Sequence, residues 1–475
     1  MPVSATAALR GRIHKALERR DHDKALGALR DAMAMGVRAA ARAGVLCHGS
    51  PEMDAFCLEI GHAIGGSNPA AAAPNPRQPL DLFVASELYA TGGHTGLLGD
   101  YLRACGRRRL LAVSRLLNGP QSLPDVIRNR LDIEAADILL CQEPGLTGKC
   151  RWLIDLIRLH RPQRVFLFTH ANDSAAIAAC VPAEDVRYHF IHHADHSPAL
   201  GAFRPDYLHI DLTPFCFACC LPTHRSRNQF LPVTAEDRGR RPAANFSKRQ
   251  SPFLTAACGS STKFELERST LYGETVATIL KATGGRHLHI GDLSPMQLRG
   301  IRRVLAGHGT AIERFDHLPF VPSLWRALAE RQVDLYIGSL PQRGARASVE
   351  AMGSGTPAIW HVASEETRFH DTHMKYPEAA TWRTQEELAA LLARIDGPWL
   401  TRQSAAARAH YEARHDPRSL ARQLAASDLD APGPALPDAG CGGPQLVAFD
   451  TLAISLPDRL YARSVAARTA WRGRA

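Results

Sequence analysis

The pattern of apolar positions begins with helical spacing. Residues 1–64 show no strand-like alternation, and apolar side chains such as Leu26, Leu29 and Met33 recur three to four positions apart. This spacing places them on one face of a helix. The stretch resembles half of a helical-hairpin repeat, and a single unit cannot bury its apolar face alone. The pattern therefore predicts a small helical N-terminal segment that packs on the main body.

After a linker rich in Pro, Ala and Asn at 65–79, short apolar runs alternate with helical stretches. This alternation is typical of βαβ units and a mostly parallel sheet. It predicts a Rossmann-like domain over 80–235. Its strands are expected at 80–86, 109–116, 136–142, 164–170 and 186–194.

A polar, Pro-containing stretch at 235–251 is typical of an interdomain linker, and the alternation then starts again. A second Rossmann-like domain is predicted over 252–425. Its strands are expected at 253–260, 286–292, 310–316, 333–339 and 356–361, followed by a helical stretch at 384–424. The predicted fold class is therefore α/β, with two tandem Rossmann-like domains and a helical N-terminal segment. Residues 426–475 are expected to form a linker and a basic C-terminal tail.

Composition excludes several classes of protein. The chain has 475 residues, 45% hydrophobic and 22% charged, as in ordinary globular proteins. No apolar run approaches the roughly 18 residues of a membrane span. The first residues contain no apolar core of a signal peptide, so a cytoplasmic location is expected. Eleven cysteines at irregular spacing indicate reduced thiols rather than a disulfide framework.

The net charge of +10 comes mainly from arginines that are spread thinly along the chain. Nucleic-acid binding is therefore not expected. A basic protein favours anionic partners such as sugar nucleotides or a negatively charged membrane. The basic tail helix has two interpretations: peripheral contact with an anionic membrane, or a solvated or partner-docking terminal helix.

Candidate chemistry is sought directly after each strand, because ligands of open α/β sheets bind beyond the carboxyl ends of the strands. The first strand is followed by Gly92, Gly93 and His94 at a predicted helix start, which favours negative charge. The turn lacks the spacing of a dinucleotide or phosphate-loop motif. His94 is a candidate general base, with a capping or packing role as the alternative.

A second histidine group follows the last predicted strand of the first domain. It contains His193, Asp195 and His196, which can be interpreted as metal ligands, an acid/base site or loop anchors. No partner motif completes a metal set. An imidazole oriented by Asp195 is favoured as a proton acceptor, and no metal is predicted.

Cys216 and Cys219 form a C-x-x-C pair, with Cys220 next to it. A zinc site would need a second such pair, and a redox motif would open a helix of a thioredoxin-like unit. Buried small apolar side chains are the favoured interpretation.

The first strand of the second domain leads into a turn of small and hydroxylated residues that can form an anion nest. Lys263 adds a charge suited to a diphosphate, although an exposed surface lysine is the alternative. The turn comprises Gly259, Ser260, Ser261, Thr262 and Lys263. Further on, a helix entry rich in Gly, Ala and Ser can point amides at phosphate, and Glu350, one turn inside, can accept hydrogen bonds from a ribose.

The Gly-Gly-His turn and the run from Ser348 through Glu350 to Pro357 resemble the GT-B superfamily of nucleotide-sugar glycosyltransferases, over roughly 80–425. The resemblance implies two Rossmann-like domains facing each other across a cleft, with the donor held by the second. It implies that Lys263 and the preceding turn contact the diphosphate, Glu350 the ribose and Ser348 or neighbouring amides the phosphate. It further implies that Gly291, His317, Gly338, Ser339 and Leu340 surround the base and that His94, or His193, Asp195 and His196, face the acceptor.

One departure bears on mechanism. Many retaining members have a second glutamate eight positions before the one that matches Glu350, where this chain has Gln342. The resemblance therefore favours an inverting member, similar to soluble bacterial protein glycosyltransferases and O-linked N-acetylglucosamine transferases. It implies transfer to a protein or glycan acceptor, with a nucleotide sugar as co-substrate, no cofactor and no essential metal. A sugar-nucleotide 2-epimerase and a non-catalytic nucleotide-binding module remain alternatives, because one fold supports many functions.

Overall fold

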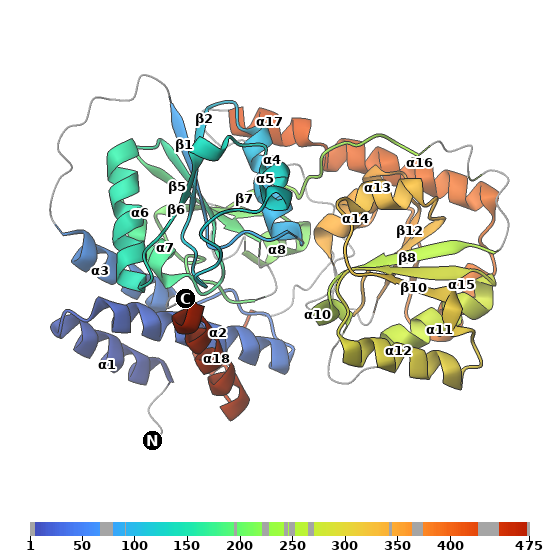
Figure 1. The fold of residues 1–475 in the computed structure, drawn as a ribbon, viewed down its shortest axis with the longest axis horizontal. Helices are drawn as coiled ribbons and strands as arrows, with labels where there is room; N and C mark the ends of the chain where they lie inside the picture. The colour runs from blue at the N-terminus through green and yellow to red at the C-terminus, as the bar shows by residue number, and fades with distance from the viewer. Residues whose placement is uncertain are drawn as a thin grey trace. The chain divides into compact units, whose positions relative to one another are not determined.

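The computed structural model describes residues 5–66, 79–90, 92–193, 197–220, 228–241, 246, 252–264, 270–341, 344–362, 374–425 and 446–472. The chain divides into two compact units (Figure 1). Unit 1 contains Met1–Ala90, His94–Leu231 and Gln423–Ala475, and unit 2 contains Thr91–Gly93 and Pro232–Arg422.

Unit 1 is built on a seven-stranded sheet with the order β3-β2-β1-β4-β5-β6-β7. Its strand pairs are parallel, and the order reverses beside β1, as in doubly wound α/β folds. All six residues of β1 are buried, because helices cover both faces of such a sheet. The strands are β1 (Leu80–Ala85), β2 (Arg108–Val113), β3 (Ile138–Leu140), β4 (Arg164–Phe168), β5 (Arg187–His192), β6 (Tyr207–Asp211) and β7 (Asn228–Phe230).

The predicted N-terminal helical segment is confirmed and packs on this sheet. Leu26, Met33 and Ile60 share one buried cluster with Val165 of β4 and Leu153. The helices of unit 1 are α1 (Ala5–Glu18), α2 (His22–Ala43), α3 (Pro51–Gly65), α4 (Gly93–Ala104), α5 (Asp125–Leu131), α6 (Leu146–His160), α7 (Ser174–Ala179), α8 (Pro214–Cys220) and α18 (Leu456–Arg472).

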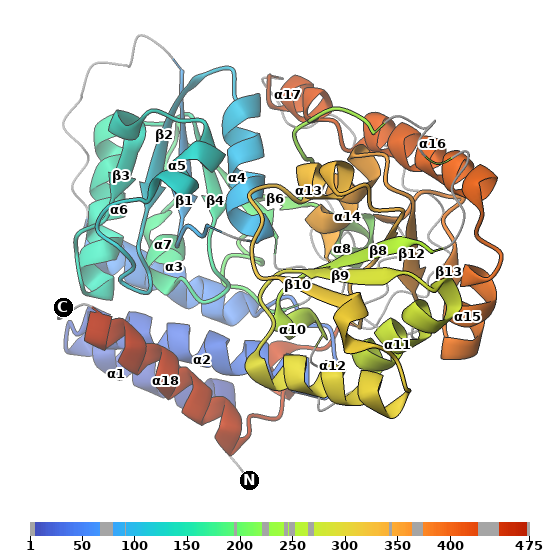
Figure 2. The same ribbon diagram turned by 45° about the vertical axis from the view of Figure 1, so that its right-hand side comes forward.

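The C-terminal helix α18 lies along α2 (Figure 2). Arg42 forms an ion pair with Asp458 at 3.0 Å, and the guanidinium of Arg38 lies 4.9 Å from the ring centroid of Tyr461. The helix therefore packs on its own chain, an arrangement that neither interpretation of the tail helix included. Contact of its outer face with a membrane stays a prediction. Among the described residues, no helix combines the length and apolar character needed to cross a membrane.

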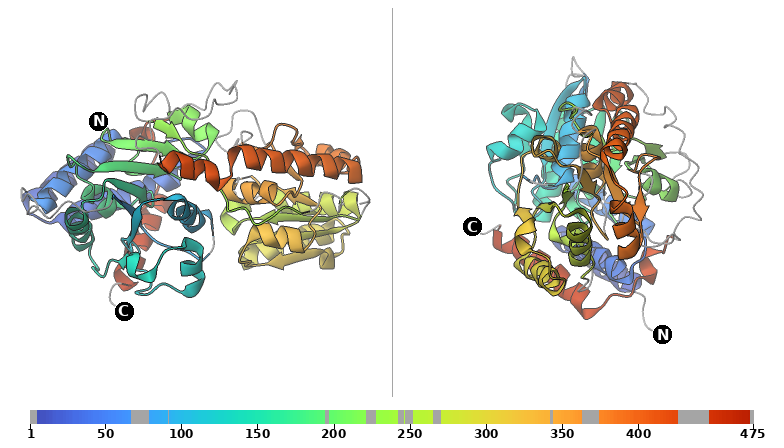
Figure 3. Two further views of the ribbon diagram at one scale, coloured as in Figure 1. Left: turned by 90° about the horizontal axis from the view of Figure 1, so that it is seen from above. Right: turned by 90° about the vertical axis from the view of Figure 1, so that its right-hand side faces the viewer.

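Unit 2 repeats the doubly wound order, with the sheet β10-β9-β8-β11-β12-β13. The helices α11 and α12 lie on one side of the sheet and α13, α14 and α16 on the other, and α16 extends along the unit (Figures 1 and 3). The strands are β8 (Leu254–Cys258), β9 (Arg286–Ile290), β10 (Phe315–Leu318), β11 (Leu335–Ile337), β12 (Ala358–His361) and β13 (Thr381–Trp382). The helices are α10 (Ser261–Phe264), α11 (Leu271–Thr283), α12 (Pro295–Gly307), α13 (Leu324–Glu330), α14 (Ala345–Gly353), α15 (Gln385–Leu392), α16 (Gly397–Arg414) and α17 (Pro417–Ala425).

The predicted fold class of two Rossmann-like domains is confirmed, with local corrections. The strand expected at 310–316 is β10 instead, because residues 312–314 form a 3-10 turn. The strands β6, β7 and β13 were not predicted, since β6 carries His and Asp and the other two have three and two residues. None of the ten described cysteines forms a disulfide, and their reduced state stays a prediction.

Candidate functional site

The predicted donor residues of unit 2 gather at its topological switch point. The strands β8 and β11 pair directly, and Gly259 follows one while Gly338 follows the other. Ligands of doubly wound sheets bind at this position, beyond the carboxyl ends of the two strands. The structure therefore brings the residues after both strands to one edge of the sheet.

Histidines of β9 and β10 donate hydrogen bonds to backbone carbonyls in the loops after β8 and β9. Nε2 of His289 lies 3.0 Å from the carbonyl oxygen of Gly259, and Nε2 of His317 lies 2.8 Å from that of Gly291. Since a carbonyl only accepts, each Nε2 carries the proton. Gly291 has φ of 128°, and a Cβ built on it would lie 2.2 Å from the Gly259 oxygen. Only glycine allows this close approach.

The hydroxyl groups of the β8 turn have different surroundings. Ser261 accepts a hydrogen bond from the N–H of Ser294 at 2.6 Å, which fixes the turn to the start of α12. Ser260 and Thr262 are exposed, and their hydroxyl oxygens lie 3.0 Å apart. The exposed pair is therefore the part of the turn that is accessible to a ligand.

Lys263 extends to the N-terminus of α14. A Cβ built on Gly344, the N-cap residue of α14, would lie 2.9 Å from Nζ of Lys263 and 3.5 Å from Oγ of Ser339. A primary ammonium, a hydroxyl and the N-terminal turn of a nine-residue helix thus converge. The first N–H groups of a helix have no intrahelical acceptor, so the arrangement can bind an anion such as a diphosphate.

The two predicted side chains inside α14 are already hydrogen-bonded. The Ser348 hydroxyl is buried and donates to the Gly344 carbonyl at 2.9 Å. The Glu350 carboxylate accepts from Nε of Arg346 and from the N–H of Trp325, both at 3.2 Å. Each carboxylate oxygen has further lone pairs, so ribose binding by Glu350 stays a prediction.

The predicted residues after β11 also serve packing. Leu340 is buried in the core of unit 2, and a Cβ on Gly338 would lie 2.5 Å from Cδ1 of Trp360. Of this group, the structure directs only Ser339 toward Lys263 and Gly344. Contact of the loop with a nucleotide base stays a prediction.

In unit 1, His94 lies in the first turn of α4. Its Nε2 is 3.0 Å from the carbonyl oxygen of Phe168, the last residue of β4, so Nε2 carries the proton. Nδ1 then has the lone pair; this atom is buried and has no hydrogen-bond partner among the described residues. Burial lowers the pKa of His94, and the bond to Phe168 offsets this only in part. The ring is therefore neutral near pH 7.

Further aromatic rings surround His94. The ring centroid of His193 lies 4.7 Å from that of His94, and His170 lies at 5.7 Å. Burial and the neighbouring His94 lower the pKa of His170 to about 3, and burial with the same neighbour holds the pKa of His193 well below its usual value. Tyr89 stacks on His170, with its hydroxyl 3.2 Å from Nε2. Asp195 and His196 lie outside the described residues.

A cavity of about 520 Å³ opens beside these rings. Sequence reasoning missed Tyr89, His170 and Asn172 among its lining residues. His170 ends the predicted fourth strand, so the rule of inspecting strand ends could have identified it. The cavity is lined by Ala34, Val37, Tyr89, Leu117, His170, Ala171, Asn172, His193, Tyr461 and Val465.

The cysteines of α8 depart from their predicted apolar role. Cys216, Cys219 and Cys220 are all buried, as expected. Cys216 and Cys220, however, contact the polar side chains of His192 and Asp211. The two cysteines that make these contacts are therefore spaced C-x-x-x-C, because positions four apart share a helix face.

Known proteins with similar folds are GT-B glycosyltransferases. No family model and no curated protein matches the sequence. Anabaena HepE, crystallised with UDP and glucose, superposes with a TM-score of 0.52 at 14% identity, covering 73% of this chain and 98% of that one. A Rickettsia africae glycosyltransferase gives 0.52 at 12% identity, with 73% and 97% covered. The lipopolysaccharide outer core galactosyltransferase WaaB gives 0.50 at 9%, with 73% and 98% covered. The chain therefore has the GT-B fold.

Proposed function

We propose that this protein is a glycosyltransferase that moves a sugar from a nucleoside diphosphate donor to a protein or glycan acceptor, with inversion and without an essential metal. The observation that carries the proposal is the convergence of Lys263, Ser339 and the N-terminus of α14 at the switch point of unit 2. The complexes of HepE with UDP and glucose and with UDP-glucose support a nucleotide-sugar donor for a protein of this fold.

Unit 2 would bind the donor through its diphosphate. During transfer, the bond between the anomeric carbon and the phosphate oxygen breaks, and its electron pair stays on that oxygen. The Lys263 ammonium and the N–H groups at the start of α14 stabilise the negative charge that develops there. These groups interact more strongly with the leaving group than with the intact donor, so they act on the rate of transfer.

Unit 1 would provide the base and bind the acceptor. The acceptor nucleophile forms a bond to the anomeric carbon from the side opposite the diphosphate, and its proton passes to Nδ1 of His94. The hydrogen bond from Nε2 to Phe168 keeps the His94 lone pair on Nδ1. His170, His193 and Tyr89, which line the adjacent cavity, would contact the acceptor.

A two-step experiment tests the proposal. A thermal-shift screen against UDP, GDP, CDP and dTDP sugars identifies the donor, because a ligand that binds only the folded state raises Tm. Release of nucleoside diphosphate is then followed with and without candidate protein and glycan acceptors. Acceptor-dependent release, with a product of inverted anomeric configuration, is the expected result.

Other outcomes identify the alternatives. Conversion of the sugar nucleotide to its 2-epimer without an acceptor would indicate an epimerase. Nucleotide binding without turnover across the acceptor panel would indicate a binding module. Failure of every sugar nucleotide to raise Tm would contradict the assignment of the donor site.

A further inference from the structure

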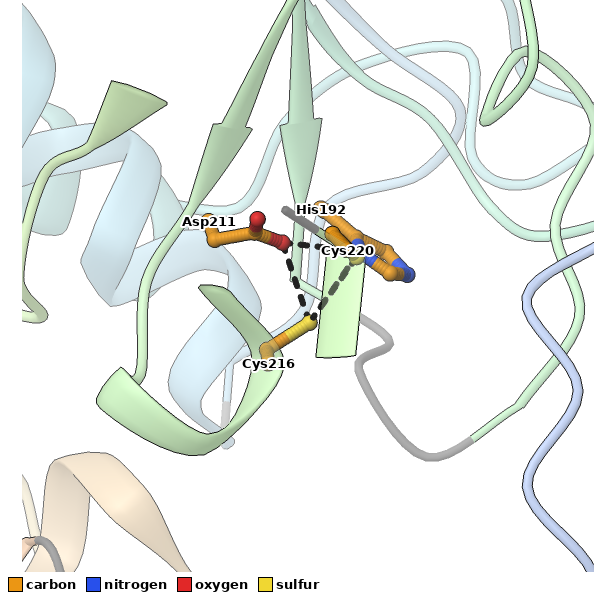
Figure 4. A group of neighbouring side chains, drawn as sticks. All are labelled: His192, Asp211, Cys216 and Cys220. Atoms are coloured by element: carbon orange, nitrogen blue, oxygen red, sulfur yellow. Dashed lines mark hydrogen bonds and ion pairs between the residues drawn. The ribbon is translucent and has the colours of Figure 1, made fainter. Parts of the chain in front are cut away.

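Four potential metal ligands meet at the carboxyl ends of two neighbouring strands of unit 1. His192 ends β5 and Asp211 ends β6, and the two residues are direct partners in the parallel register. Cys216 and Cys220 follow on α8, four positions apart and hence on one helix face. Figure 4 shows the Asp211, Cys216 and His192 side chains directed toward one another, with Cys220 beside the imidazole.

The polar atoms of this cluster crowd around one point. Nδ1 of His192 lies 3.0 Å from Oδ1 of Asp211, 3.1 Å from Sγ of Cys216 and 3.6 Å from Sγ of Cys220. The Cys216 sulfur lies 3.0 Å from the same Asp211 oxygen and 3.9 Å from the Cys220 sulfur. A ring nitrogen makes one well-formed hydrogen bond. Hydrogen bonding alone therefore does not explain why three polar atoms lie close to Nδ1 of His192.

The separations match the edges of a tetrahedron around a zinc ion. With Zn–S near 2.3 Å and Zn–N or Zn–O near 2.1 Å, the edges are about 3.8 Å for S to S, about 3.6 Å for S to N or O and about 3.4 Å for N to O. Five of the six separations lie within about 0.6 Å of these edges, and all the ligand atoms lie within 4.8 Å of one another. Binding thus requires only small side-chain adjustments.

The burial of the four side chains also favours a bound cation. The side chains of all four residues have at most 1% of their surface exposed. A carboxylate removed from water needs a compensating charge or hydrogen bonds, and Oδ2 of Asp211 has no hydrogen-bond partner among the described residues. A divalent cation at the centre of the cluster supplies that compensation.

We propose that unit 1 binds one Zn²⁺ through Nδ1 of His192, a carboxylate oxygen of Asp211 and the thiolates of Cys216 and Cys220. Two sulfurs, one nitrogen and one oxygen form a donor set suited to zinc, and four protein ligands leave no open position. The site is therefore structural, and its assignment does not rest on the glycosyl transfer proposed above.

Two more histidines contact the proposed ligands directly, and Nε2 of His209 lies 3.1 Å from Nδ1 of His192. Nδ1 of His48 lies 3.2 Å from the Cys220 sulfur, and Nε2 of His209 lies 3.2 Å from Oδ1 of Asp211. Such outer contacts orient metal ligands. The ion ties α8 to the ends of β5 and β6, and the residue after His192 is His193, which lines the cavity of unit 1. Metal binding would thereby fix one wall of that cavity.

The test uses the full chain, purified without a histidine tag and analysed by plasma mass spectrometry. The expected result is one zinc per chain, lost in the double variant Cys216→Ala/Cys220→Ala. Cys219→Ala is the matched control, because this cysteine is on the same helix and buried but packs beside Leu46 and Phe215. It should retain the metal.

A second measurement does not depend on variant folding. X-ray absorption of the wild-type protein should show two sulfur ligands at about 2.3 Å and two nitrogen or oxygen ligands near 2.1 Å. Substoichiometric zinc in protein prepared with zinc in the medium would overturn the proposal. A zinc shell without sulfur, or full zinc retention in the double variant, would also overturn it.

Discussion

Substituting Gly291 by alanine tests whether the loops after β8 and β9 depend on a close backbone approach. The new Cβ would lie 2.2 Å from the Gly259 oxygen and 2.8 Å from its carbonyl carbon. Both are backbone atoms, so neither can rotate away. The residue would also have φ of 128°, which L-residues rarely adopt.

The cost is estimated from these two effects. A backbone in a disfavoured region costs about 1–3 kcal/mol, and a forced shift of packed neighbours costs about 1–3 kcal/mol more. Gly291→Ala should therefore destabilise unit 2 by about 2–6 kcal/mol, which corresponds to roughly 4–24 °C in Tm for a unit of this size. Displacement of Gly259 should also weaken donor binding, since the turn leading to Lys263 begins there.

Gly300→Ala provides the matched control. Gly300 lies within α12, and a Cβ there meets no atom within 4 Å. Alanine at this position should raise stability by about 0.5–1 kcal/mol, because glycine is a poor helix former. Calorimetric unfolding and titration with the donor found in the thermal screen measure both effects. Equal stability and affinity for the two variants would refute the interlocked-loop interpretation.

Further predictions concern the two candidate sites and the response to pH. Lys263→Ala should weaken donor binding about 10- to 100-fold, because a charge-assisted contact is lost. The control Lys281→Ala, at an exposed position, should leave donor binding unchanged. Isothermal titration calorimetry measures both affinities. His94→Ala should lower turnover about 10²- to 10⁴-fold with donor affinity retained. The control His62→Ala, at an exposed position, should behave as wild type. Unchanged turnover in His94→Ala would exclude His94 as the base. His287 is buried and hydrogen-bonded by Thr255 and Tyr272, and burial together with His289 lowers its pKa from 6.5 to about 3. As the pH falls below 6.5, His287 becomes protonated in the unfolded chain before it does in the folded protein. The residue therefore contributes stability above pH 6.5 that is lost as the pH falls toward 3, by up to about 1.4 kcal/mol per pH unit. Denaturant unfolding between pH 5 and 7 should show a shallower pH dependence for His287→Gln than for wild type, and identical slopes would contradict the assignment.

The candidate donor site was largely predictable because it depends on strand ends. Gly259, Lys263 and Ser339 follow apolar runs that are recognisable in the sequence, and the carboxyl ends of parallel strands meet at one edge. The sequence did not reveal that Lys263 extends to Gly344, since this contact joins residues 81 positions apart through the order of the strands.

The histidine and cysteine cluster was missed for a related reason. Cys216 was assessed only with its neighbours in the sequence, and His192 falls inside the strand predicted at 186–194. Asp211 ends a strand that the hydrophobic pattern did not predict, because β6 includes polar side chains. Because β6 was not predicted, no pattern in the sequence indicated that the end of β5 lies beside α8.

Local patterns of apolar side chains thus determined that the chain forms helices followed by two doubly wound α/β units, because burial of those side chains requires such elements. They also located the strand ends at which polar chemistry collects. Only the tertiary structure decided which strand ends are neighbours, that α18 packs on α2, and that His192, Asp211, Cys216 and Cys220 converge on one point. The physical reason is that strand order and helix docking are fixed by contacts between residues far apart in the chain, which short-range periodicity does not encode.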